Sequence, residues 1–249
     1  MKRMTTAALA ALTLSAVLLA ATGCTRVPLQ DSPTTKTFTE SSAVPLKGAT
    51  QLDAVIEQGV GDLTIRSSSE TSGAVETLFT FAPESWRPEV TSSVEGTKAD
   101  VRIAQPQSSQ APLFSNVRNS WVISLPGGVG TDLTLQLGVG TSNVDLRGVE
   151  IANLHALTGV GDTTIDLSGP RTADLGARIE AGVGKLTVRV PKSVGVRVTG
   201  RQDGLGKFSA NGFTAQGDTW VNEAYRGPGP KIDIDLVRGV GDVMLVMAD

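Results

Sequence analysis

A short glycine motif, G-[VL]-G, recurs seven times in this chain and limits the folds that the chain can adopt. The motifs begin at residues 59, 128, 138, 159, 182, 204 and 239. Between the motifs at 138, 159, 182 and 204 the spacings are 21, 23 and 22 residues. Repeats of about 20 to 50 residues are typical of solenoids, propellers and arrays, and a four-stranded propeller blade needs about 40 or more. The spacing therefore predicts one solenoid turn per repeat.

The residues after each motif alternate as they would in a strand with one buried face. The fourth residue after the second glycine is Thr134 in one motif and apolar in the other six: Ile65, Val144, Ile165, Val188, Ala210 and Leu245. We predict that these six form an inward column and that the residues following four of them face solvent: Arg66, Asp145, Asp166 and Arg189. We therefore expect an all-β fold, a single-stranded β-solenoid similar to a parallel β-helix, with turns of ~22 residues stacked roughly 4.8 Å apart.

Glycine suits a corner between such strands because it accepts positive φ and lets a neighbouring backbone approach closely. We predict that the valine between the two glycines points into the core. A phosphate-binding loop would lead into a helix, whereas every motif here leads into a strand pattern. Calcium binding at the corners stays open as an alternative, because Asp62, Asp162 and Asp242 follow their motifs. Lys185 and Lys207 occupy the equivalent positions elsewhere, so we expect no metal site and no cofactor.

The N-terminus has the pattern of an export signal. Lys2 and Arg3 precede an apolar run at 7–21, and small residues at 21–23 precede Cys24. The run is shorter than the roughly 20 residues that a membrane span requires. The arrangement resembles the signal peptide and lipobox of bacterial lipoproteins, which implies that Cys24 is lipidated and anchors the chain to the bacterial cell membrane, or to the outer membrane where there is one. An ordinary secretory signal with an incidental cysteine is the alternative.

We divide the chain into a signal peptide at 1–23, a tether at 24–48 and a β-solenoid domain at 49–249. The tether is rich in Thr, Ser and Pro without apolar periodicity. The domain is irregular to about residue 125 and carries the regular repeats at 126–249. Without the signal the chain has 20 basic and 25 acidic residues, and no basic stripe. Nucleic acid is therefore excluded as a partner.

Catalytic residues are not evident in the sequence. His155, the one histidine, lies at the outward parity of its strand pattern, and no GxSxG nucleophile motif is present. We therefore expect no enzyme activity. The alternative is a protein that binds or cleaves polysaccharide with an outer face that carries Asp145, Asp166 and Arg189.

The last strand pattern, 242-DVMLVMAD-249, is apolar on both faces. Val243, Leu245 and Met247 take the inward parity, yet Met244 and Val246 are apolar as well. A strand that is apolar on both faces is normally covered on both. We expect either that residues 74–125 cover Met244 and Val246, or that these two residues form an interface with a second copy or a partner.

The stretch WVISLPGGVGTDLTLQLGVGTSNVDLRGVEIANLHALTGVGDTTIDLSG, together with LDAVIEQGVGDLTI at 52–65, resembles the toast-rack family of bacterial envelope proteins. Related sequences include adhesin-like proteins and the soluble part of regulators of cell-wall antibiotic responses. The resemblance covers about residues 51–249 and implies the β-strand-repeat fold, but it carries over no catalytic residue. It implies a lipid-anchored, non-enzymatic binding, scaffold or adhesin-like module, with a role in the envelope stress response. The membrane and an envelope protein or glycan are the expected partners.

Overall fold

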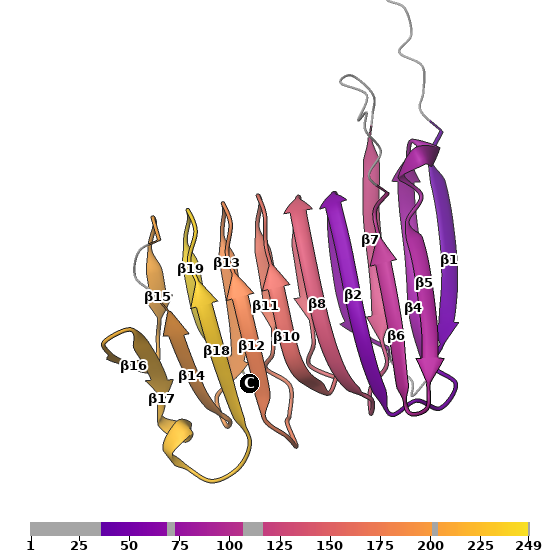
Figure 1. Cartoon of the computed structure of the whole chain (residues 1–249). Coiled ribbons are helices and arrows are strands. Elements are labelled where there is room, and N and C mark those ends of the chain that lie inside the picture. The colour runs from indigo at the N-terminus through magenta and orange to yellow at the C-terminus, as the bar shows by residue number, and fades with distance from the viewer. Residues whose placement is uncertain (1–35, 69–72, 107–116, 201–203, 249) are drawn as a thin grey trace, which may run out of the picture. The chain divides into compact units, whose positions relative to one another are not determined.

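The computed structural model describes residues 36–68, 73–106, 117–200 and 204–248, and these residues form two facing β-sheets (Figure 1). Among the described residues, the sheet called A here has nine strands, in spatial order β1 (Phe38–Pro45), β4 (Ala74–Ala82), β7 (Arg118–Leu125), β3 (Asp62–Ser67), β9 (Ser142–Asp145), β11 (Thr163–Asp166), β13 (Leu186–Pro191), β19 (Val243–Ala248) and β15 (Phe208–Ala210).

Sheet B has ten strands within the same described ranges, in the order β16 (Phe213–Gln216), β17 (Thr219–Asn222), β14 (Gly195–Gly200), β18 (Lys231–Val237), β12 (Leu175–Glu180), β10 (Ile151–Leu157), β8 (Gly130–Val139), β2 (Gln51–Val60), β6 (Lys98–Ala104) and β5 (Glu89–Glu95). Two short 3₁₀ helices, η1 (Glu84–Trp86) and η2 (Glu223–Arg226), lie in the connections.

In the middle of the fold the chain crosses from one sheet to the other at every turn. Strands β8, β10 and β12 pair in parallel in sheet B, and β9, β11 and β13 pair in parallel in sheet A. The predicted inward column is confirmed for Ile65, Val144, Ile165, Val188 and Leu245, all of which are buried. Ala210 is partly buried against the same core. Inward residues of sheet B complete the core, among them Ile56, Leu135, Ala156, Ile179 and Leu236.

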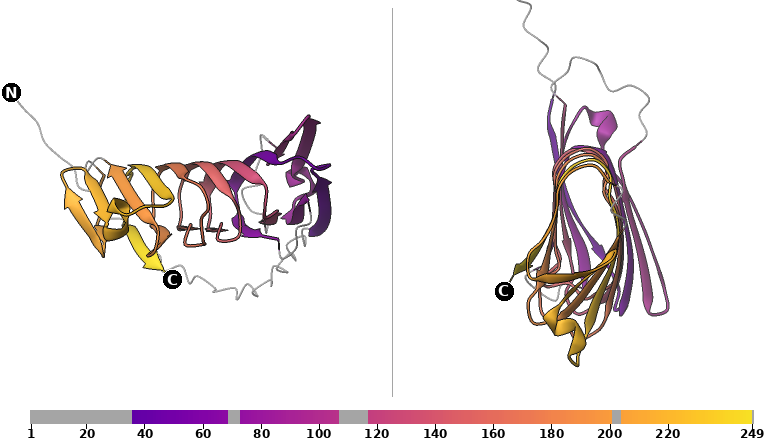
Figure 2. Two further views of the ribbon diagram at one scale, coloured as in Figure 1. Left: turned by 90° about the horizontal axis from the view of Figure 1, so that it is seen from below. Right: turned by 90° about the vertical axis from the view of Figure 1, so that its left-hand side faces the viewer.

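Six of the seven glycine motifs form corners at one edge of the two sheets, as predicted, and Figure 2 shows these corners superimposed along the stack. A Cβ on Gly159 would lie 2.0 Å from the carbonyl oxygen of Gly138, and one on Gly161 would lie 1.9 Å from that of Gly140. Gly161 also has a φ of +134°. Both reasons for glycine therefore apply at this corner.

The predicted direction of the middle residue is wrong for six of the seven motifs. The middle residues of these six are exposed and form a row that we call the valine ridge: Val60, Val139, Val160, Val183, Val240 and Leu205. They occupy the apex of each corner, on its convex side, where there is no core to enter. The motif at 128 differs, because it precedes β8 at the opposite edge and buries Val129. This placement also explains why its fourth residue, Thr134, is not apolar.

Both ends of the stack carry antiparallel strands. β1 pairs antiparallel with β4 and β4 with β7 at one end, while β16 and β17 form an antiparallel pair at the other. Aromatic side chains pack there: Phe79 against Trp121 at 5.4 Å and Phe208 against Trp220 at 4.4 Å between ring centroids. Such ends protect sheet edges from pairing with other chains.

The last turns are not stacked in sequence order, contrary to the expectation from the spacing. β18 lies between β12 and β14, and β19 lies between β13 and β15. The C-terminal turn is therefore inserted between two earlier turns. β18 separates β12 from β14, and β19 separates β13 from β15.

The fold is all-β, as predicted, with two sheets that each mix parallel and antiparallel pairs. These mixed sheets do not confirm the predicted single solenoid along the whole domain. Part of the predicted tether is also structured, because Phe38–Pro45 pair with β4 over their full length. Val44 of β1 is buried. This burial and the pairing with β4 order the strand, although its sequence lacks an obvious apolar period. The predicted signal peptide and Cys24 lie outside the described residues.

Candidate functional site

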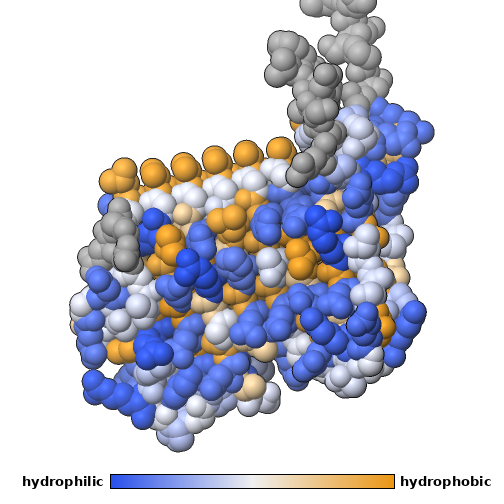
Figure 3. Space-filling view, in the orientation of Figure 1, coloured by the Kyte–Doolittle hydropathy of each residue, from blue (hydrophilic) through white to orange (hydrophobic). Residues whose placement is uncertain are grey.

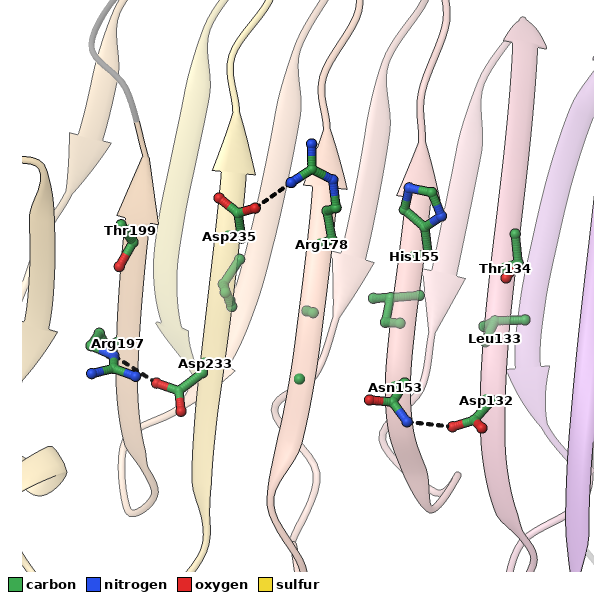
Figure 4. A pocket seen from close by; sticks show the side chains of 14 residues that line it. Asp132, Leu133, Thr134, Asn153, His155, Arg178, Arg197, Thr199, Asp233 and Asp235 are labelled. Atoms are coloured by element: carbon green, nitrogen blue, oxygen red, sulfur yellow. Dashed lines mark hydrogen bonds and ion pairs between the residues drawn. The ribbon is translucent and has the colours of Figure 1, made fainter.

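Polar side chains cover the outer face of sheet B in two parallel rows (Figure 4). Residues two apart on a strand share a face, and the strand register aligns them across β8, β10, β12, β18 and β14. One row consists of Asp132, Asn153, Gly176, Asp233 and Arg197. The other row consists of Thr134, His155, Arg178, Asp235 and Thr199. We call these ten residues the polar face.

Gly176 interrupts the first row, because it is the one position there without a side chain. The nearest atom to a Cβ built on Gly176 would be Oδ1 of Asn153, at 3.4 Å. A hollow of about 660 Å³ opens along these strands and is lined by both rows. The missing side chain thus leaves room for a ligand group between Asn153 and Asp233.

Ion pairs and hydrogen bonds link six side chains of the polar face in three pairs. The Asn153 amide donates to Asp132 at 2.8 Å, and Nε of Arg197 donates to Asp233 at 2.8 Å. Arg178 donates to Asp235 from Nη1 at 2.5 Å. These ionic side chains are about half exposed, so the pairs add little to stability. They keep charged donors and acceptors accessible to a ligand.

Glu180, next to the polar face, is held in its ionised form. Nε of Arg178 donates to its Oε1 at 2.8 Å, and this hydrogen bond is the main reason that the pKa of Glu180 lies below its usual value. Nε2 of His155 lies 3.6 Å from the same oxygen. The same hydrogen bond to Glu180 is the main reason that the pKa of Arg178 is raised.

Tyr225 lies beside the first row, and its hydroxyl donates to Oδ1 of Asp233 at 3.0 Å. The Arg197 guanidinium lies over its ring at 5.2 Å from the centroid. Burial, and then the hydrogen bond to Asp233, raises the pKa of Tyr225. The phenol therefore stays protonated at neutral pH and acts as a donor.

The polar face is suited to binding rather than to acid–base chemistry. Glycoside hydrolysis needs one carboxyl group that stays protonated, usually through an apolar surrounding. Asp233 and Asp235 share one face, but each is about half exposed and paired with an arginine, so neither carboxyl group lies in such an apolar surrounding. In the described part of the chain, no cluster of three or more His, Cys, Asp or Glu is arranged to hold a metal ion.

The three residues that the sequence suggested for a polysaccharide site lie on sheet A, away from the hollow. Asp145 forms a two-point pair with Arg147, at 2.9 and 2.6 Å. This hydrogen bonding lowers the pKa of Asp145. The expected exposure of Asp166 is wrong, because it is buried. Its Oδ1 accepts from the hydroxyl of Ser168 at 2.5 Å, and Arg147 and Arg189 flank it at 3.8 and 3.9 Å.

Met244 and Val246 lie on the outer face of β19, where they are half-buried. The neighbouring strands supply the cover, with Met244 beside Thr187 of β13 and Ser209 of β15. The described residues of 74–125 do not cover them, because β4 and β7 of that region lie at the other end of sheet A. The interface role of Met244 and Val246 stays a prediction.

Sequence reasoning placed His155 outside correctly but missed the polar face as a whole. The alternation in 231-KIDIDLV-237 signals an exposed Asp233 and Asp235. Their neighbours Arg178 and Arg197 come from strands on either side of β18. Because β18 is inserted out of sequence order, repeat spacing alone could not bring these residues together.

The family model for the N-terminal domain of toast_rack proteins, DUF2154, matches residues 32–189. This chain belongs to the toast-rack family. The solved structures include a chain described as a "putative cell adhesion protein" from Clostridium sporogenes, 28% identical, with a TM-score of 0.75. That match covers 86% of this chain and 100% of the other.

A second structure, a "putative adhesin" from Bacteroides fragilis, is 15% identical with a TM-score of 0.35. It covers 86% of this chain and 99% of that one. No curated protein matches the chain. Within the residues that the structure describes, no helix is both long enough and apolar enough to span a membrane.

Proposed function

We propose that this toast-rack protein is a non-enzymatic, adhesin-like binding module of the bacterial cell envelope and that the polar face is its binding surface. The observation that carries this proposal is the pair of aligned polar rows around the gap at Gly176. The similarity to a chain named for cell adhesion supports the same class of function. The parallel turns of 126–200 serve as a solenoid-like scaffold for the rows.

An extended ligand with repeating polar groups fits this surface. Neighbouring strands are ~4.8 Å apart, so each row offers hydrogen-bonding groups at regular intervals. Hydroxyl and amide groups of an envelope glycan can exchange for solvent on Asn153, Arg178 and Asp235 without breaking the core. A glycan is therefore the ligand class that we favour, with an envelope protein as the other partner class. Cleavage of that glycan is not part of the proposal, since Asp233 and Asp235 are half exposed and paired with arginines rather than set in an apolar surrounding.

Binding of purified envelope polysaccharide, measured by a glycan panel and by isothermal titration, tests the polar face. Arg178→Ala and Gly176→Val should each weaken binding at least tenfold, the first by removing donors and the second by filling the gap. Arg147→Ala, in the turn after β9, is the matched control, because it removes an exposed, paired arginine outside the hollow. Equal affinity for all three variants and the parent chain would exclude the polar face as the binding surface.

Export and anchoring complete the proposal. Lipidation of Cys24, followed by removal of 1–23, would hold the domain at the outer surface of the cell membrane, or of the outer membrane, and a role in the envelope stress response would act from there. Two or more acyl chains anchor a protein stably, whereas one binds only marginally. Membrane fractionation of Cys24→Ser tests this part separately. The variant should move to the soluble exported fraction, and unchanged membrane association would disprove the anchor.

A further inference from the structure

The valine ridge is a continuous apolar row along one edge of the described molecule (Figure 3). Its six side chains are 42% to 69% exposed. The backbone beneath them is fully engaged between corners: for example, Gly140 donates to the carbonyl of Val160 at 2.9 Å, and Gly161 to that of Val183 at 2.8 Å. The corners superimpose along the stack (Figure 2), so the row is straight and rigid. Removing water from this edge would leave few backbone groups without partners.

A second row, on the sheet A side of the ridge, holds the residue that follows each motif. In spatial order from the β2 end, this row reads Asp62, Thr141, Asp162, Lys185, Asp242 and Lys207. The carboxylates of Asp162 and Asp242 accept from the backbone N–H groups of Lys185 and Lys207, at 3.1 and 2.9 Å. Among the ion pairs of the described residues, none uses the side chain of a residue in this second row.

The charges of the second row are complementary to those of the same row read backwards. Reversal puts Asp62 opposite Lys207, Thr141 opposite Asp242, and Asp162 opposite Lys185. A twofold axis that lies across the ridge, in the plane between two copies, produces this reversal and keeps each sheet A side against the other. An axis along the ridge would instead bring sheet A of one copy against sheet B of the other.

We propose that the valine ridge is an interface between two copies of this chain, packed antiparallel about a twofold axis. Val60 then faces Leu205 of the second copy, Val139 faces Val240, and Val160 faces Val183. Such an isologous contact is the commonest way in which identical chains associate. Stable protein–protein interfaces bury about 1,200–2,000 Å² of surface. The ridge is only one side chain wide, so we expect it to bury less than that. We therefore expect a weak dimer in solution and a stronger one when both copies are held at one surface.

Cysteine cross-linking tests the direction of packing. The full chain with Cys24→Ser has no other cysteine, so Val60→Cys and Leu205→Cys can be introduced singly and given different mass tags. Mixed and mildly oxidised, the two variants should form a disulfide-linked pair that contains one of each. Each variant alone should stay uncrosslinked. Val60–Val60 cross-links, or no cross-link in the mixture, would overturn the proposal.

Sedimentation velocity over a concentration series tests the chemistry of the contact. Val160→Asp should abolish the dimer with an unchanged melting temperature, whereas Leu78→Asp, at another exposed apolar position, on β4, should leave the dimer intact. Asp162→Lys should weaken association at least tenfold, and the double variant with Lys185→Asp should restore it. Failure of this restoration would overturn the antiparallel arrangement. If the parent chain is monomeric and binds phosphatidylcholine vesicles, and if Val160→Asp abolishes that binding, then the ridge contacts a membrane and not a second copy. That result would overturn the proposal.

Discussion

At the scale of single residues, two separate constraints require glycine at the corners, and the free energy that each contributes can be measured separately. Gly161 needs both its positive φ and the absence of a Cβ that would lie 1.9 Å from the Gly140 carbonyl. Gly128 has a φ of +69° but no atom within 4 Å of such a Cβ. Gly128→Ala should cost about 1–3 kcal/mol, from backbone strain alone. Gly161→Ala should cost more, because the neighbouring corner must move. Urea denaturation of both variants checks this, and equal losses would contradict the close-approach argument.

The ion pair between Asp145 and Arg147 leads to a prediction, also at the residue scale, about how the stability of the fold changes at acidic pH. The pKa of Asp145 is lower in the folded chain, chiefly through its hydrogen bond with Arg147, than the value of about 3.9 in an unfolded chain. Its stabilisation is therefore present above about pH 4 and is lost as the pH falls through the folded value. Asp145→Asn should reduce the loss of stability between neutral and acidic pH. Thermal melts across a pH series measure the effect, and identical pH profiles would rule out a contribution from the pair.

At the scale of elements, the strands at the ends of the stack act as covers for the repeated turns. Trp220 of β17 is buried and packs against Phe208 of β15, and the Arg238 guanidinium lies 5.3 Å from the Phe208 ring centroid. Trp220→Ala should destabilise the domain by about 3–5 kcal/mol, the usual loss for a large buried aromatic residue. Phe213→Ala, at the half-buried position of the neighbouring strand β16, is the milder control. If circular dichroism shows no change in the unfolding midpoint for Trp220→Ala, the cover and the turns unfold independently.

At the scale of the whole molecule, the inserted C-terminal turn makes the fold depend on the last residues of the chain. Without 231–249, both β12 and β14 would lose a neighbour in sheet B, and β13 and β15 would lose one in sheet A. A chain that ends at residue 230 should therefore lose protection from limited proteolysis throughout 175–230. In a stack built in sequence order, the loss would be confined to the final turn. Mass spectrometry of the fragments distinguishes the two outcomes, and protection of 175–200 in the shortened chain would contradict the inserted arrangement.

The sequence by itself determined the all-β class, the corners and most of the inward column, because glycine tolerance and period-two alternation are local properties. It also placed His155 outside. The tertiary structure alone decided the order of turns, since the place of β18 and β19 depends on pairing with strands that are distant in the sequence. That order brings Arg178, Asp235 and Arg197 together on the polar face. The structure likewise decided the outward direction of the valine ridge, because whether the apex of a corner faces core or solvent depends on the curvature of the whole turn and not on alternation along one strand.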